Sequence, residues 1–80
     1  MFILINLTQS EYERPEMTKI GAYETKERAQ KAMRTMFDAD VKLAKVDGWY
    51  DADYSGITDT LAWVDGELFT NHYEIFEAKE

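Results

Sequence analysis

The sequence predicts a small α+β protein with two layers: one four-stranded sheet, antiparallel or mixed, with a single amphipathic helix on one face. Three observations lead to this fold class. Strand-like segments cover residues 2–7, 18–23 and a hairpin over 57–76, one helical pattern covers 26–45, and a chain of 80 residues has room for only one core. The expected order is therefore strand, strand, helix, strand, strand, in a single domain over residues 1–80.

The first two segments differ in character. Residues 2–7 are large and apolar at almost every position, which is typical of a strand covered on both faces and predicts a central strand. Residues 18–23 carry Ile20 and Tyr23, and Gly21 between them indicates a bulge or a weak point in the second strand.

The helix has start and stop signals. Thr25 can cap a helix that begins at Lys26, and Glu27 lies in its positive first turn. Asp47-Gly48 ends it. Apolar residues follow the cap at three- and four-residue spacing, as expected for one buried face: Ala29, Ala32, Met33, Met36, Phe37, Val41 and Ala44.

The C-terminal segments predict a hairpin. Residues 57–64 and 69–76 are both strand-like, and Asp65-Gly66 between them is a strong turn signal because both residues tolerate positive φ. Trp63 and Leu61 would share one side of their strand with Ile57, so this strand, like 2–7, is apolar on both faces. One helix covers only one face of a sheet. The second face needs a cover, and we favour the aromatic loop near residues 49–54 or a homodimer equally, ahead of a foreign protein.

Negative charge is concentrated in the C-terminal part of the chain. The formal net charge is -7. Residues 1–45 are nearly neutral, whereas residues 46–80 contain nine acidic residues and one basic residue, together with seven of the eleven aromatic residues. A net negative charge argues against direct binding to nucleic acid or to an anionic membrane, since both require a positive field.

Two interpretations of this acidic and aromatic mixture stay open. The carboxylates can simply keep a small domain soluble around an aromatic core. Alternatively, the acidic aromatic loop 47–56 and its neighbours form a recognition surface, with carboxylates for Lys and Arg of a partner and aromatic anchors. The candidate partner-binding residues are Asp47, Trp49, Tyr50, Asp51, Asp53, Tyr54, Asp59, Asp65 and Glu67.

The chemical motifs are few. Residues 51–59 place side-chain oxygens at several positions of a calcium-binding loop, but Ala62 stands where a bidentate Glu belongs, so an acidic turn is the favoured interpretation. His72 is the single histidine, and a catalytic role would need Asp51, Asp53 or Asp59 beside it in space. The chain has no Cys. We therefore expect no catalytic residues, no metal and no cofactor.

Nothing in the sequence predicts targeting or membrane insertion. The apolar run 2–5 has no basic region before it and is far shorter than a signal sequence or a membrane span. The absence of Cys suits a reducing compartment. We expect a cytoplasmic protein of a bacterial host.

Four stretches carry a resemblance to a protein group. Residues 20–29, Gly56-Ile57, residues 62–66 and residues 72–77 resemble small uncharacterised proteins of Gram-positive bacteria and their phages. Small acidic proteins of that setting often inhibit host defence, and several anti-CRISPR proteins present carboxylates where a nuclease binds phosphate. By analogy, the resemblance implies a host-defence inhibitor.

Together these lines predict a non-enzymatic acidic binding protein that blocks a basic nucleic-acid-binding surface of a host nuclease by charge mimicry. The alternatives are an oligomer that binds or sequesters a small ligand such as a nucleotide, and a structural accessory dimer. The nucleotide-binding alternative requires a pocket lined by cationic groups.

Overall fold

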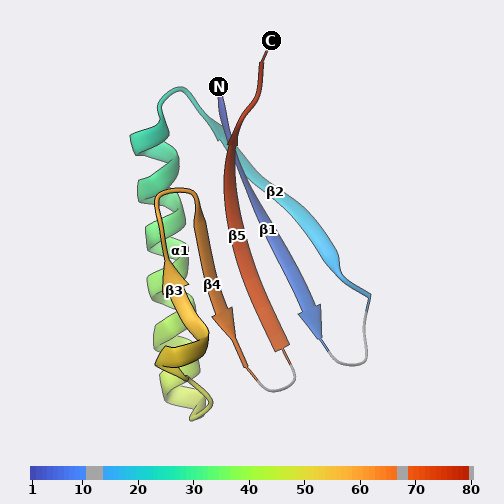
Figure 1. Ribbon diagram of the computed structural model, residues 1–80, viewed down its shortest axis with the longest axis vertical. Helices are drawn as coiled ribbons and strands as arrows, with labels where there is room; N and C mark the ends of the chain where they lie inside the picture. Colours follow the sequence, from blue (N-terminus) through green and yellow to red (C-terminus); the bar gives the residue numbers. More distant parts are fainter. Residues whose placement is uncertain (11–13, 67–68, 80) are drawn as a thin grey trace.

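A computed structural model describes residues 1–10, 14–66 and 69–79, apart from the side chain of Phe69. One helix lies on one face of a five-stranded antiparallel sheet with strand order β2-β1-β5-β4-β3 (Figure 1). The elements are β1 (Phe2–Ser10), β2 (Glu16–Tyr23), α1 (Lys26–Asp47), the 3₁₀ turn η1 (Ala52–Tyr54), β3 (Ser55–Ile57), β4 (Leu61–Asp65) and β5 (Phe69–Glu77). The α+β class, the two layers and the single helix are confirmed. The predicted number of four strands was wrong, because the sheet has five.

The fifth strand arises because the expected strand 57–64 is itself a hairpin. The Thr58 Oγ1 accepts hydrogen bonds from the N–H groups of Thr60 and Leu61, and the Thr58 N–H donates to the Leu61 carbonyl at 2.7 Å. A Thr side chain that bonds the following backbone favours a turn over an extended chain. Ile57 therefore belongs to β3 and faces the helix with its partner Ala62, not the side of Trp63.

The segment 47–56 is not one loop. Asp47 is still helical, η1 follows after a short connection, and Ser55 already pairs with Val64 in the sheet. The strands β1 and β2 also extend past the expected ranges 2–7 and 18–23, since they continue to Ser10 and begin at Glu16.

Two local predictions are confirmed in β2 and α1. The register between β1 and β2 shifts between Leu4 and Ile5, whose partners are Gly21 and Lys19, so Ile20 is the extra residue of a bulge. The Thr25 Oγ1 accepts the Arg28 N–H at 3.2 Å as the helix cap. Gly48 ends the helix at φ 82°. Glycine adopts this left-handed conformation without the steric penalty that a residue with a side chain would meet.

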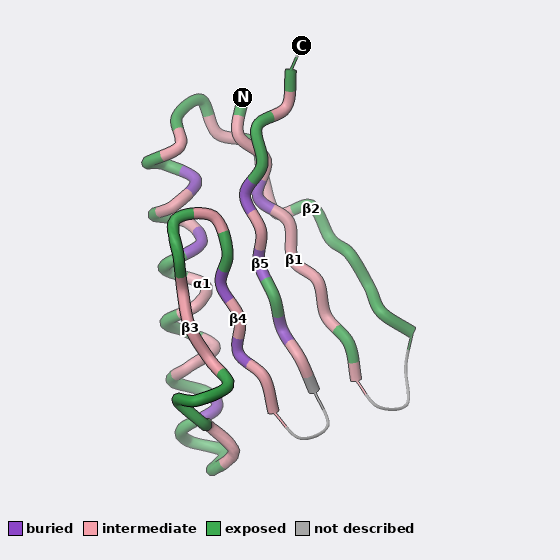
Figure 2. The backbone as a smooth tube through the Cα atoms, viewed as in Figure 1, coloured by how far each residue is buried: buried purple, intermediate pink, exposed green. Residues whose placement is uncertain are grey.

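The core lies between α1 and the sheet. Its buried members alternate along the strands and recur on one side of the helix, and Figure 2 shows them along the facing sides of the two layers. They are Leu4, Ala29, Met33, Ala62, Tyr73 and Ile75. The helix thus covers the face that carries Leu4, and the opposite face of the sheet, here called the open face, is turned away from it.

The segment 49–54 does not cover the open face. The Trp49 N–H donates to the Ala44 carbonyl, and the Lys45 ammonium lies 5.0 Å from the centre of the Tyr50 ring. η1 contacts β3 and β4. The segment is thereby attached to the end of α1, and Leu61 and Phe76 on the open face each stay 44% exposed.

Trp63 lies over Gly56 on the open face. A Cβ at Gly56 would lie 2.7 Å from the Cζ2 of Trp63, closer than real carbon atoms approach. Gly56 lets the indole lie flat across β3, so part of the open face is covered from within by Trp63.

Candidate interaction surface

The turn η1 holds two carboxylates in a defined arrangement at one end of the molecule. The Asp51 Oδ1 accepts the Asp53 N–H at 2.9 Å, and the Tyr54 N–H donates to the Asp51 carbonyl at 3.1 Å. Both carboxylates are exposed, and the Tyr54 side chain follows them with 62% of its surface exposed. The Asp51 side chain caps its own turn, so the backbone bonds fix where these groups stand.

Two of the three predicted aromatic anchors are engaged within the protein. Tyr50 lies beneath the Lys45 ammonium, and Trp49 is half-buried beside the end of the helix. Only part of each ring is available to a partner. Of the aromatic residues predicted in this segment, Tyr54 is therefore the exposed anchor.

Two further predicted carboxylates lie at the same end. Asp47 is the exposed last residue of α1. Asp65 ends β4, and because Ser55 pairs with Val64, the antiparallel register places Asp65 across the hairpin from Tyr54. We call Asp47, Asp51, Asp53, Tyr54 and Asp65 the acidic end.

The Asp65 carboxylate has an internal partner. Its Oδ1 lies 2.7 Å from the Nε2 of His72 on β5, and both side chains are partly exposed. His72 therefore pairs with Asp65. A catalytic role for His72 would have required Asp51, Asp53 or Asp59 beside it.

The remaining predicted site residues are not brought to the acidic end. Asp59 lies in the turn between β3 and β4, at the opposite end of that hairpin from η1, where its carbonyl accepts the Gln30 Nε2 at 3.0 Å. Asp59 therefore lies apart from Asp51 and Asp53, because β3 is extended between them, and its role in partner binding stays a prediction. Glu67 lies outside the described residues.

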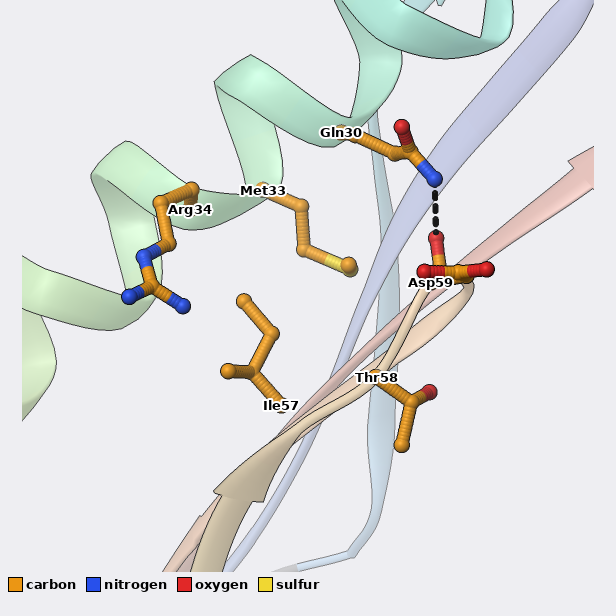
Figure 3. Close-up of a pocket in the computed structure, with 6 residues that line it drawn as sticks. All are labelled: Gln30, Met33, Arg34, Ile57, Thr58 and Asp59. Carbon is orange, nitrogen blue, oxygen red and sulfur yellow. Dashed lines mark hydrogen bonds between the residues drawn. The ribbon is translucent and has the colours of Figure 1, made fainter.

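A hollow of about 300 Å³ lies between α1 and the turn that holds Asp59 (Figure 3). Its described lining combines Met33 and Ile57 with the polar residues Gln30, Arg34, Thr58 and Asp59. The Arg34 guanidinium is 3.7 Å from the exposed Asp38 carboxylate. One cation facing one carboxylate gives this hollow little attraction for a nucleotide, whose phosphates need several donors.

The extended β3 also separates the oxygens of the calcium-like loop. Asp51 and Asp53 precede β3 and Asp59 follows it, so the three carboxylates do not converge. Over residues 1–10, 14–66 and 69–79, no three acidic, His or Cys side chains group closely enough to hold a metal ion.

A polar network that was not predicted from the sequence joins the helix to the sheet. The Asp40 Oδ2 accepts hydrogen bonds from the Asn71 Nδ2 at 2.6 Å and from the Tyr73 hydroxyl. The Asn6 Nδ2 donates in turn to the Asn71 Oδ1 and to the His72 carbonyl. The network joins α1, β1 and β5, and so fixes the C-terminal half of the helix against the sheet.

The pattern held a signal for this network. Asp40 occupies an inward position of the helix, three residues after Phe37 and four before Ala44, and Asn6 interrupts an apolar strand. A polar residue at an inward position requires a buried partner. Burial raises the pKa of Asp40 above its usual value, although the hydrogen bonds from Tyr73 and Asn71 lower it. Burial and the neighbouring Asp40 raise the pKa of Tyr73.

We predict that Asp40→Asn gains stability relative to the wild type as pH rises from about 4 to 7. A raised pKa means that the folded state binds the Asp40 proton more tightly than the unfolded state, so the wild type loses stability as pH rises through that pKa. Asn does not titrate. Urea unfolding at both pH values measures the difference, and a difference that shrinks toward pH 7 would show that the hydrogen bonds outweigh burial.

Comparison with known proteins gives this chain no relatives: no family model, no curated protein and no solved structure matches it. Among the residues that the structure describes, no helix has an apolar stretch long enough to cross a bilayer.

Proposed function

We propose that the protein is a non-enzymatic binding module whose acidic end occupies a basic surface of another protein. The observation that carries this proposal is η1, where backbone bonds hold the exposed Asp51 and Asp53 beside the exposed Tyr54. Tyr is one of the residue types that supply most of the binding energy at protein interfaces.

The arrangement suits competition with nucleic acid. Carboxylates on a fixed turn present anionic oxygens to Lys and Arg, which bind carboxylate and phosphate through the same charge-assisted hydrogen bonds. Asp47 and Asp65 extend the negative surface on either side of η1. The partner that fits is a nucleic-acid-binding protein. If that partner is a nuclease of a host defence system, occupation of its nucleic-acid-binding surface inhibits the nuclease. The protein would act in the bacterial cytoplasm, where such a nuclease operates.

The preorganised turn favours this function over simple solubility. Exposed carboxylates that only keep a protein dissolved need no fixed geometry. Here the Asp51 side chain holds the N–H of Asp53, and Tyr54 is presented to solvent with 62% of its surface. A turn whose backbone is already fixed loses less entropy on binding than a free one.

The proposal predicts capture of a basic nucleic-acid-binding protein from a Gram-positive lysate at low salt, with loss of that protein at high salt. Screening weakens interactions between exposed charges. A tagged chain, washed at two salt concentrations, and mass spectrometry of the bound proteins make the measurement. Capture of no basic protein, or retention that salt does not change, would contradict the proposal.

Charge changes at the acidic end should weaken this capture by about tenfold or more. The variant Asp51→Asn/Asp53→Lys keeps the oxygen that caps η1 but makes the charge more positive by three. Its matched control, Glu24→Gln/Glu27→Lys, makes the same change at exposed positions near the start of α1, at the other end of the molecule. Equal losses in the two variants would assign binding to overall charge and not to η1.

A further inference from the structure

The open face of the sheet carries an uncovered apolar surface. Alternate residues of β1 point to this face, and the sheet register places their neighbours beside them. The apolar members are Ile3, Ile5, Leu7, Leu61, Trp63 and Phe76, of which Leu61 and Phe76 are exposed and the other four are half-buried. A surface of this kind on a small domain marks an interaction site.

Two hollows give this face a shape that can receive side chains. One of about 230 Å³ lies beside Trp63 and is lined also by Leu7, Leu61 and His72. A second of about 270 Å³ shares Leu7 and His72 and extends to Pro15. The segment 49–54, one of the two covers that the sequence favoured equally, is attached to the end of α1.

The residues on either side of β1 match one another. On the open face, Ile5 has Lys19 on its β2 side and Glu74 on its β5 side. Ile3 has Ala22 on its β2 side and Phe76 on its β5 side. A base thus mirrors an acid across β1, and a small residue mirrors a large one.

We propose that the open face binds a second copy of this chain, with a two-fold axis that runs along β1. That rotation lays the β2 row of one copy over the β5 row of the other, so Lys19 meets the Glu74 of the second copy and Phe76 meets its Ala22. Residues Ile3, Ile5 and Leu7 pack on the axis. A surface that is complementary to itself is what a two-fold dimer requires, and twisted sheets pack face to face with their strands nearly aligned.

Among two-fold axes that run parallel to the strands, the charges favour the one along β1. A two-fold axis along β5 would place Glu74 over its own copy, and like charges in contact oppose association. An axis between β1 and β5 would place Ile5 over Glu74 and Leu61 over Lys19, so each apolar residue would meet a charge. With the axis on β1, Trp63 lies beside the β2 edge of the second copy, where Met17 is 69% exposed in one chain.

The dimer would present two acidic ends together. Because the axis runs along the strands, both copies of η1 lie at the same end of the assembly. A partner with two basic sites would then be bound with a higher effective concentration for the second contact. This last consequence, unlike the dimer itself, rests on the proposed function.

Charge exchange at Lys19 and Glu74 tests the dimer. Sedimentation velocity over a range of concentrations should give twice the 9.4 kDa mass of one chain. Lys19→Glu and Glu74→Lys alone should each raise the dissociation constant by about tenfold or more, since each brings two like charges together. The double variant Lys19→Glu/Glu74→Lys should restore the dissociation constant to within about threefold, because it re-creates the pairs with their signs exchanged.

Lys31→Glu and Glu27→Lys on the exposed side of α1 are the matched controls, and circular dichroism verifies that every variant folds. A chain that stays monomeric at millimolar concentration would overturn the proposal. So would a dimer that tolerates both single changes, or a double variant that fails to recover. None of these results depends on a foreign partner, so the dimer can fail while the proposed function stands.

Discussion

Leu4→Ala should lower the free energy of unfolding by about 2 to 5 kcal/mol. Leu4 is 0% exposed and belongs to the same buried cluster as Ala29, Met33 and Tyr73. Truncation removes buried methyl groups and leaves a cavity that a small sheet beneath one helix cannot easily close. Because an 80-residue domain is expected to have about 4 to 12 kcal/mol of stability in total, the loss is a large fraction of it.

Urea unfolding followed by circular dichroism measures this effect. The matched control is Leu43→Ala, the same truncation on the outer side of α1, where Leu43 is 59% exposed. We expect the control to change the free energy of unfolding by less than about 1 kcal/mol. Similar losses in the two variants would contradict the placement of the core between the Leu4 face of the sheet and the helix.

Asn71→Leu should lower the free energy of unfolding by about 2 to 3 kcal/mol at neutral pH. Asn71 is 8% exposed, donates to the Asp40 carboxylate and accepts from Asn6. Leucine has a similar volume but offers no polar atom. The substitution leaves the partly buried Asp40 carboxylate with one hydrogen-bond donor fewer. A buried polar group without its hydrogen bond lowers the stability of the folded state.

The double variant Asp40→Leu/Asn71→Leu distinguishes a polar cause from a steric one. Removal of both partners eliminates the carboxylate that lacks a donor. The double variant should therefore recover part of the free energy of unfolding that Asn71→Leu loses. Urea unfolding of the wild type, the single variants and the double variant gives the coupling between the two sites. Strictly additive losses would show that Asp40 and Asn71 do not act as one network.

Local sequence signals predicted the parts of the fold that local interactions determine. Thr25 and Gly48 mark the ends of the helix because caps act within one turn. The antiparallel pairing of the last two strands is confirmed, but the predicted turn at Asp65-Gly66 was wrong, because Asp65 is the last residue of β4 and neither Asp65 nor Gly66 takes a positive φ. The extra strand was missed because β3 has only three residues, too few to show a period. The turn that begins at Thr58 contains no Gly or Pro, the residues that usually indicate a turn.

The site was predictable in composition but only partly in arrangement. The sequence identified Asp51, Asp53 and Tyr54, and the structure places them together on η1. The sequence could not show that β3 separates Asp59 from Asp51 and Asp53, since the separation depends on where the strand begins. Nor could it show that Lys45 lies over Tyr50, because that contact depends on the turn the chain makes after Gly48.

Competition with DNA for the captured protein tests the central claim most directly. The probe is a fluorescein-labelled DNA duplex bound to that protein, and fluorescence anisotropy reports its release. The account predicts that the wild type displaces the duplex, that Asp51→Asn/Asp53→Lys needs about tenfold more protein to do so, and that Glu24→Gln/Glu27→Lys behaves as the wild type. A duplex that stays bound while the chain saturates the same protein would contradict the account.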